Sequence, residues 1–342
     1  MHNASPLVCI CIPTFNAQTT IVETLLSILN QTYTNLSVVV VDNASSDNTA
    51  ALVEALSDPR VKIHRNPVNL GGEGNFTRCV ELAHGKYTAI FHADDVYQPS
   101  MVEQQVAFLE AHPQAGAVFT EVGLIDEAGN SIGAIKAPAE LKSPIEEYDF
   151  SNVFRTVLKH ANFLICPSAM VRTEVYQRDV KIWQGAEYGT SADLDVWFRI
   201  LLHHPVGILR KPLINYRIST NQHSSGLRAR ITRSDMFRVL DYYLALPNVR
   251  VQLTASDWIN FARLERTDRV VRAVNLYLLG REQEARSLCR EAVNPDAFLA
   301  GLVSKRGSIT LALILFLNGV IFLKLSVLAR PVLKLAKRFI NK

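Results

Sequence analysis

The sequence lacks the features that mark disulfide-stapled, zinc-finger, nucleic-acid-binding and secreted proteins. Its five cysteines form no C-x-x-C pair, so neither a disulfide framework nor a zinc-ligand pattern is present. The net charge is only +4, from 36 Lys and Arg against 32 Asp and Glu, which does not indicate nucleic acid as a partner. No low-complexity tract occurs, and residues 1–6 do not begin a secretory signal. We therefore expect a packed cytoplasmic protein with reduced core cysteines.

The first part of the chain alternates short β-branched runs with helical periods. Strands are expected at residues 7–12, 36–41, 61–64 and 86–91, with helices at 20–29, 46–56 and 74–84. This order predicts an α/β fold with an open, doubly wound sheet, whose ligand site lies at the carboxyl ends of the strands. Farther along, we expect a helix at 100–111, a strand at 116–122 and a helix at 194–202.

The last third of the chain is predicted to be helical. Residues 231–246, 255–279 and 282–293 show apolar spacing near 3.6, and the last two ranges are expected to form a helical hairpin.

Residues 307–323 carry no charge and are barely long enough to span a membrane. Basic residues flank this run, and more follow it than precede it, so a full crossing would oppose the positive-inside tendency. An in-plane or re-entrant helix, followed by the basic amphipathic stretch 332–340, keeps these charges beside anionic headgroups. An ordinary buried core helix is the alternative. We favour membrane association without a full crossing.

Polar residues follow the first two expected strands. The first strand ends in Pro13, Thr14 and Asn16, and the second ends in Asp42 after four valines. Asp42 is placed to accept a hydrogen bond from a base N–H, whereas Asp47 is better explained as a cap of the next helix.

The fourth expected strand ends in His92-Ala93-Asp94-Asp95. Adjacent carboxylates repel each other, which is costly unless water or a cation neutralises them. A divalent cation with oxygen ligands meets that need and would also carry a diphosphate. A merely solvated loop is the alternative, but the edge shared with Asp42 favours a binding site.

A glycine-rich stretch at residues 69–74 lacks the G-x-G-x-x-G spacing of dinucleotide-binding proteins. This argues against a nicotinamide-dependent oxidoreductase. The glycines are expected to permit a tight entry into the next helix.

Two carboxylates, Asp193 and Asp195, open the helix expected near residue 194. Asp195 lies four residues before Arg199 and is expected to pair with it. Asp193 has no such local partner, so it is the better candidate for a general base.

Taken in this order, these stretches resemble the family 2 glycosyltransferases, which are inverting enzymes of the GT-A fold that use nucleotide-diphosphate sugars. The resemblance covers about residues 6–225. It rests on P-T-F-N at 13–16, Gln31-Thr32-Tyr33, the Val-Asp-Asn-Ala-Ser-Ser-Asp run at 41–47, Asn69-Leu70-Gly71, the acidic strand end, Pro167-Ser168, Asp193 with Trp197 and Arg199, and Tyr216-Arg217.

The resemblance implies a Rossmann-like mixed sheet flanked by helices in residues 1–225. We expect a helical extension in 226–300 and membrane-associating helices in 301–342. It implies that Asp193 deprotonates the acceptor and that a divalent cation, Mn or Mg, binds at Asp94, Asp95 and His223. The expected donor-binding residues are Pro13, Thr14, Asn16, Asp42, Asn69, His92, Asp94 and Arg217.

The chain departs from the family pattern at three places. His92 replaces the first aspartate of the usual D-x-D motif, Ala192 replaces the glutamate before the base, and Ser219 stands where a histidine is common, with His223 four residues later.

We expect an inverting transferase that moves a sugar from a UDP-sugar to a lipid-linked glycan acceptor at the cytoplasmic face of a bacterial inner membrane. Its partners are then the donor, the acceptor and an anionic membrane surface. The alternative is a nucleotide-sugar-binding protein with weak or lost transferase activity.

Overall fold

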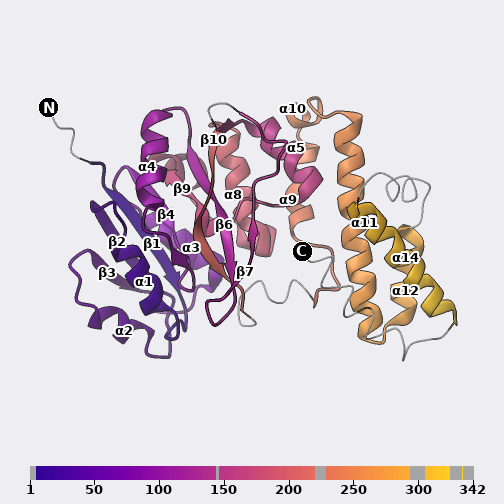
Figure 1. Cartoon of the computed structure of the whole chain (residues 1–342), viewed down its shortest axis with the longest axis horizontal. Coiled ribbons are helices and arrows are strands. Elements are labelled where there is room, and N and C mark those ends of the chain that lie inside the picture. The colour runs from indigo at the N-terminus through magenta and orange to yellow at the C-terminus, as the bar shows by residue number, and fades with distance from the viewer. Residues whose placement is uncertain (1–4, 144–145, 220–228, 293–304, 324–332, 334–342) are drawn as a thin grey trace. The chain divides into compact units, whose positions relative to one another are not determined.

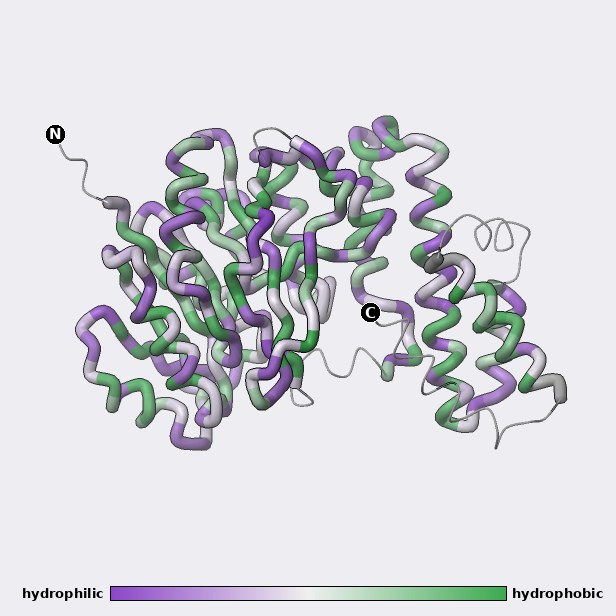
Figure 2. Tube along the Cα trace, in the orientation of Figure 1, coloured by the Kyte–Doolittle hydropathy of each residue, from purple (hydrophilic) through white to green (hydrophobic). Residues whose placement is uncertain are grey.

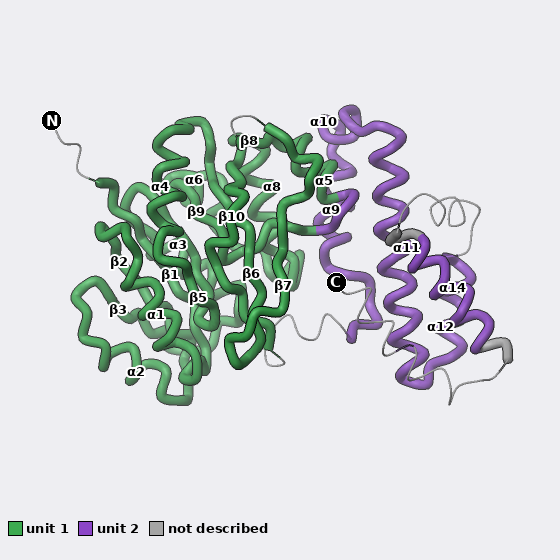
Figure 3. Tube along the Cα trace, viewed as in Figure 1, with its two compact units in different colours: residues 1–157, 162–219 green, residues 158–161, 220–342 purple. Residues whose placement is uncertain are grey.

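The computed structural model of the chain describes residues 5–143, 146–219, 229–292, 305–323 and 333. The chain forms two compact units (Figure 3). Unit 1 comprises residues 1–157 and 162–219, and unit 2 comprises residues 158–161 and 220–342.

Unit 1 is built on one mixed sheet, shown in Figure 1, with the strand order β3-β2-β1-β4-β9-β6-β10-β5; β7 pairs with β6, and β8 pairs with β10. Strands β1, β2, β3 and β4 are all parallel to one another. This confirms the doubly wound arrangement predicted for the first part of the chain. The strands are β1 Val8–Thr14, β2 Leu36–Asp42, β3 Val61–Arg65, β4 Tyr87–Ile90, β5 Val96–Tyr97, β6 Ala117–Ile125, β7 Ser131–Ile135, β8 Glu147–Tyr148, β9 Met170–Arg172 and β10 Val206–Arg217.

Helices connect these strands and cover the sheet. The predicted helices near residues 20, 46, 74, 100 and 194 are all present. They are α1 Ile21–Leu29, α2 Thr49–Ala55, α3 Gly71–Leu82, α4 Met101–Ala111 and α8 Ala192–Leu201, accompanied by α5 Phe150–His160 and the short α6 Thr173–Val175 and α7 Gly185–Tyr188.

Strand β10 was not predicted, although it lies in the middle of the second half of the sheet. Its apolar pattern is interrupted by Arg210, Lys211 and Pro212, and a proline cannot donate to a strand ladder. The structure absorbs this interruption in register shifts on either side of Pro212, where β10 pairs with β6. The three-residue β9 is too short to leave a periodic signal.

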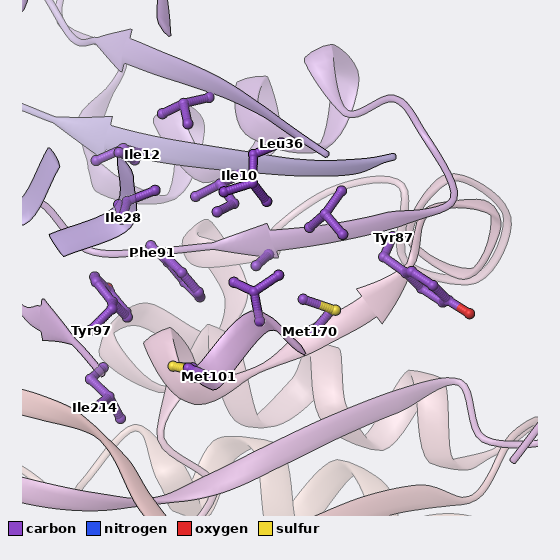
Figure 4. Packing of buried hydrophobic residues seen from close by; sticks show 14 of the residues in the cluster. Ile10, Ile12, Ile28, Leu36, Tyr87, Phe91, Tyr97, Met101, Met170 and Ile214 are labelled. Atoms are coloured by element: carbon purple, nitrogen blue, oxygen red, sulfur yellow. The ribbon is translucent and has the colours of Figure 1, made fainter. Parts of the chain in front are cut away.

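The hydrophobic core of unit 1 reaches the end of β4 (Figure 4). Phe91 and Tyr97 stack with ring centroids 3.9 Å apart, next to Ile10 and Ile12 of β1 in the same buried cluster. The hydroxyl of Tyr97 accepts a hydrogen bond of 2.7 Å from the backbone N–H of His92. Core packing therefore fixes the backbone where the acidic strand end begins.

The cysteines are free thiols, and four of the five are buried, as predicted. Cys9 and Cys11 lie on one face of β1 with their sulfur atoms 3.7 Å apart.

Unit 2 is helical. Its helices are α9 Met236–Ala245, α10 Pro247–Arg250, α11 Ala255–Leu278, α12 Glu282–Ala292 and α14 Lys305–Leu323. Helices α11 and α12 pack as the predicted hairpin, with Gly280 at a positive φ of 82° in the turn.

Helix α14 is hydrophobic along most of its length (Figure 2), and one of its faces packs inside the protein. Ile314, Leu317 and their neighbours on that face belong to one buried cluster with residues of α11 and α12, whereas Leu315 on another face is 53% exposed. One face of α14 is therefore buried as in an ordinary core helix, which was the alternative to membrane association. Among the described helices, none is long and apolar enough to cross a membrane. The amphipathic stretch 332–340 lies outside the described residues, apart from Leu333.

Leu317→Ala is expected to lower the free energy of unfolding by about 2–5 kcal/mol, because it leaves a cavity at a fully buried position. Leu315→Ala is the matched control and is expected to change that free energy by less than about 0.5 kcal/mol. Urea unfolding of the full chain, followed by circular dichroism, measures both. Equal and small effects would show that α14 contributes no core packing.

Candidate active site

The candidate site lies at the carboxyl ends of β1, β2 and β4, where the sequence predicted it. Thr14 ends β1 directly opposite Asp42 at the end of β2. The backbone N–H of Asn43 donates to the carbonyl of Thr14 at 2.8 Å, which holds the two strand ends together. His92 is the second residue after β4. Parallel strands bring these three chain segments to one edge of the sheet.

Thr14 and Asp42 are buried, and each keeps one oxygen atom without a hydrogen-bond partner. These atoms are the Thr14 Oγ1 and the Asp42 Oδ1. The other carboxylate oxygen of Asp42 accepts from the Ser45 N–H at 3.3 Å and lies 3.7 Å from the Nε of Arg65. Buried polar atoms without partners are uncommon and costly, so this pair is suited to receiving the polar edge of a ligand. Sequence reasoning missed Arg65, although its position at the end of β3, next to β2, was a usable signal.

Asn16 and Asn69, both predicted donor-binding residues, shape the loops around this pair. Asn16 adopts a positive φ of 50°, and its side-chain oxygen accepts from the Ser46 N–H at 2.9 Å. The side-chain oxygen of Asn69 accepts from Asn43 Nδ2 at 2.9 Å and from the Gly71 N–H at 2.8 Å. Gly71 opens α3 at a positive φ of 76°, which confirms the tight entry expected from the glycines. Contact of either asparagine with donor stays a prediction.

The acidic strand end brings His92, Asp94 and Asp95 together, with one potential ligand atom of each lying within 4.8 Å of the others. Asp95 is fully buried; one of its oxygens accepts from the Arg217 N–H at 2.9 Å, and the other has no hydrogen-bond partner. Burial raises the pKa of Asp95 well above its usual range, and the charge of Asp94 raises it further. Burial lowers the pKa of His92 and so favours the neutral ring, against the opposing charge of Asp94.

This group of side chains fits a divalent cation. The unpartnered atoms are the Oδ2 of Asp95 and the Nε2 of His92, and carboxylate oxygen with neutral imidazole nitrogen is a donor set that suits Mn²⁺. A cation would also offset the repulsion between the two adjacent aspartates. His223, the third metal residue predicted from the sequence, lies outside the described residues.

Arg217 is buried behind the acidic strand end and uses its side chain to hold it. The guanidinium donates to the carbonyl of Asp94 at 2.8 Å and to the carboxylate of Glu23 at 2.6 Å. It also donates to the carbonyls of Asp126 and Glu127. These contacts hold the carbonyl of Asp94 and the carboxylate of Asp95, which the sequence did not indicate. Contact of Arg217 with the donor stays a prediction.

Arg217→Lys is expected to raise the Mn²⁺ concentration for half-maximal donor hydrolysis by about 10- to 100-fold, because one ammonium cannot span these partners. Arg210→Lys, on the same strand and bonded to carbonyls at residues 137, 138 and 141, is the control and should leave this concentration unchanged. Weaker donor binding with an unchanged Mn²⁺ requirement would instead assign Arg217 to the donor phosphates.

Asp193 lies in the first turn of α8. One of its oxygens accepts from the Leu194 N–H at 2.8 Å, and the other accepts from Asn162 Nδ2 at 3.4 Å, a partner that the sequence did not reveal. Burial raises the pKa of Asp193 to about 6. Asp195 is buried and bonds to Arg199 at 2.8 Å, which confirms the predicted pair. A carboxyl group with this pKa can accept or release a proton near neutral pH, and the role of Asp193 as a general base stays a prediction.

The Cys166 thiol is affected by the charges of both Asp193 and the acidic strand end. Burial raises its pKa, and the charges of Asp193 and Asp95 both raise it further, so both carboxylates lie within electrostatic range of one thiol. Phe76 of α3 packs edge-on against His92 at 5.6 Å and against Trp183 at 4.8 Å between ring centroids. Sequence reasoning missed all three of these neighbours, because only the folded chain brings them to the site.

Comparison with known proteins gives a consistent result. A family model described as glycosyl transferase family 2 matches residues 9–179. The chain is 31% identical over 226 residues to an uncharacterized glycosyltransferase of Haemophilus influenzae, covering 64% of this chain and 68% of that protein. It is 35% identical over 103 residues to the Escherichia coli UDP-Glc:alpha-D-GlcNAc-diphosphoundecaprenol beta-1,3-glucosyltransferase WfgD, covering 30% of this chain and 41% of that enzyme.

Solved structures share the fold at low sequence identity. Staphylococcus aureus TarS in complex with UDP-GlcNAc aligns with a TM-score of 0.55 and 15% identity, covering 82% of this chain and 90% of that one. The mannosyltransferase PcManGT from Pyrobaculum calidifontis, in complex with GDP-Man and Mn²⁺, aligns with a TM-score of 0.54 and 17% identity, covering 96% of this chain and 88% of that one.

Proposed function

Because the chain belongs to glycosyl transferase family 2 and has the GT-A fold, we propose that it transfers a sugar, with inversion, from a UDP-sugar to a membrane-held, lipid-linked glycan acceptor. One observation carries the proposal. Thr14 and Asp42, with unpartnered buried oxygens, share a sheet edge with the His92–Asp94–Asp95 cluster, and Asp193 lies within electrostatic range of the same thiol as Asp95. A donor site, a diphosphate site and a base are the three parts that the reaction needs.

In this reaction Asp193 accepts the proton of the acceptor hydroxyl while that oxygen bonds to the anomeric carbon of the donor sugar. The bond between the sugar and the diphosphate breaks, and the nucleoside diphosphate leaves with the electron pair. Because attack and departure occur on opposite faces in one displacement, the anomeric configuration inverts. With a pKa of about 6, Asp193 is mostly the required carboxylate at pH 7.

His92, Asp94 and Asp95 would hold the divalent cation, Mn or Mg. When bound, such a cation would stabilise the negative charge of the departing diphosphate. Thr14 and Asp42 would bind the nucleobase end of the donor, and Asp95 would keep its geometry through the Arg217 N–H.

The choice of donor and acceptor is supported by the relatives. TarS is seen with UDP-GlcNAc, and the name of WfgD gives both a UDP-sugar donor and an undecaprenol-linked acceptor. We place the enzyme at the cytoplasmic face of the bacterial inner membrane as a peripheral or monotopic protein, bound to its anionic surface in part through residues 301–342.

Slow hydrolysis of a panel of nucleotide sugars, with and without Mn²⁺, tests the donor assignment. We expect one UDP-sugar to be hydrolysed faster than its GDP and dTDP counterparts, and only with the cation. Addition of an undecaprenol-diphosphate-linked sugar should then divert the donor from water to a glycosylated lipid. Hydrolysis of no nucleotide sugar, together with binding of none, would contradict the proposal.

A second candidate is a nucleotide-sugar-binding protein that has lost transfer. The observation in its favour is that His92 and the buried Ala192 occupy positions where the family usually has carboxylates. Donor binding without hydrolysis or transfer, under conditions where His92→Asp restores turnover, would favour this candidate.

A further inference from the structure

The corner of unit 2 where α10 meets α11 exposes large apolar side chains. Val251 is 82% exposed, Ile259 is 52% exposed and Trp258 is 36% exposed. All three lie within nine residues of the chain, on the segment that joins the two helices and on the first two turns of α11. Neighbouring apolar side chains exposed on one corner of a protein mark an interaction surface.

A capping box defines the start of α11 at this corner. Thr254 and Asp257 form a capping box, in which the Thr254 N–H donates to Asp257 Oδ2 at 2.8 Å and the Asp257 N–H donates to Thr254 Oγ1 at 3.3 Å. The cap fixes the first turn of α11, so Trp258 and Ile259 are held outward while Asp257 is buried.

The exposed charged side chain of the corner is basic, and the surrounding part of the sequence is basic as a whole. Between residues 242 and 262 the one acidic residue is the buried Asp257, whereas Arg250 is exposed and its guanidinium lies 5.9 Å from the ring centroid of Trp258. In the sequence, residues 220–342 hold 20 Lys and Arg against 9 Asp and Glu, so this part is strongly basic while residues 1–219 carry a net negative charge.

We propose that this corner inserts into the interface of an anionic phospholipid bilayer, with Val251 and Ile259 in the acyl region and Trp258 and Arg250 at the headgroups. Tryptophan side chains prefer the membrane interface. An arginine can extend its guanidinium toward a lipid phosphate while its aliphatic stem remains in apolar surroundings. Each basic residue near the surface adds attraction to anionic lipid. A short wedge of this kind anchors a peripheral protein without crossing the bilayer.

The corner is distinct from residues 301–342, on which the sequence placed the membrane contact. One face of α14 is occupied by packing against α11 and α12, whereas Val251, Trp258 and Ile259 face solvent. The inference rests on unit 2 and needs no donor. It deepens the proposed function by supplying the membrane contact that a lipid-linked acceptor requires.

Vesicle sedimentation with the full chain tests the proposal, using vesicles of phosphatidylglycerol and phosphatidylcholine or of phosphatidylcholine alone. The double variant V251D/I259D is expected to bind the anionic vesicles at least about tenfold more weakly than the wild type. Leu279→Asp, which changes a side chain 63% exposed at the other end of α11, is the matched control and should bind within about twofold.

Tryptophan fluorescence reports on the corner directly, because Trp183 and Trp197 are buried. Emission of the wild type should shift to the blue with anionic vesicles and be quenched by brominated acyl chains, and Trp258→Phe should lose both signals while keeping its thermal midpoint.

Unchanged vesicle binding by V251D/I259D, or an unchanged Trp258 signal on binding, overturns the proposal. Self-association of the wild type that V251D/I259D abolishes, without vesicle binding, would assign the corner to a contact between copies. Donor hydrolysis measured without vesicles should be equal in all these variants, so failure here is separate from failure of the transferase proposal.

Discussion

Asp193→Asn is expected to lower the rate of sugar transfer by about 10²- to 10⁴-fold, the typical cost of losing a positioned base. Donor affinity should stay within a few-fold, because the groups assigned to the donor and its cation lie at the ends of β1 and β2 and just after β4. The measurement is the transfer rate at saturating donor and Mn²⁺, together with the donor Kd. Asp195→Asn is the matched control in the same helix turn. It removes the negative charge that pairs with Arg199 and should lower stability more than it lowers the chemical rate.

The pH dependence follows from the pKa of about 6. The base acts only as a carboxylate, so the transfer rate should fall tenfold per pH unit below about pH 6 and reach a plateau above it. Asp193→Asn should remove this acidic limb from whatever activity remains. A wild-type profile that is flat between pH 5 and 8 would contradict the assignment.

Stability supplies an independent control for the same variant. The folded protein holds the Asp193 proton up to about pH 6, whereas the ordinary value is 3.8, so the folded state binds more protons within that window. Its stability therefore decreases as the pH rises from about 4 to 6, and the penalty remains at pH 7. Asp193→Asn removes that penalty and should unfold at the same or a higher temperature at pH 7. Lost activity with a lowered thermal midpoint would point to misfolding instead.

Asp94→Asn is expected to abolish metal-dependent turnover, with a loss of at least about 10²-fold at a fixed Mn²⁺ concentration, because it removes a charged member of the cluster. Binding of Mn²⁺, measured from the electron paramagnetic resonance of the free ion, should weaken in parallel in the presence of UDP. This readout does not depend on catalysis.

Asp47→Asn is the control for the metal assignment. Asp47 also follows a strand of the same edge, but its oxygens accept from the Thr49 and Gln18 N–H groups. Asp47 therefore binds the first residue of α2 as expected from the sequence, although the N-cap itself is Asn48. It should keep the wild-type Mn²⁺ requirement. Near-normal turnover and Mn²⁺ binding in Asp94→Asn would show that the metal assignment is wrong.

Residues close together in sequence accounted for the successful predictions. The parallel strands β1 to β4 were readable because each buried strand is a short β-branched run between turn residues. The Asp195–Arg199 bond was readable because residues four apart on a helix are neighbours. The acidic strand end was readable because two adjacent carboxylates need neutralisation whatever surrounds them.

The missed neighbours of the site come from distant parts of the chain. Asn162 is 31 residues from Asp193, and the Arg217 side chain reaches Glu23 across 194 residues. No periodicity or spacing connects such positions, because their contact exists only once the sheet has brought β10 and α1 around the end of β4. For the same reason the sequence did not reveal these contacts of Arg217, whose contact with the donor stays a prediction.

For helix α14, too, the sequence predicted one property and the tertiary structure decided another. The uncharged run 307–323 determines that this segment avoids water, since burying apolar surface is favourable in lipid and in a protein core alike. A helix that contacts lipid and a helix buried in a protein core can have the same apolar composition. The sequence alone therefore did not distinguish membrane association from burial in the protein core. Only tertiary packing decided that Ile314 and Leu317 face α11 and α12. By itself the sequence determined the strands β1 to β4, the sheet edge at which they end and the carboxylates of that edge. The tertiary structure decided the second half of the sheet and the side chains that support those carboxylates, because these contacts join residues far apart in the chain.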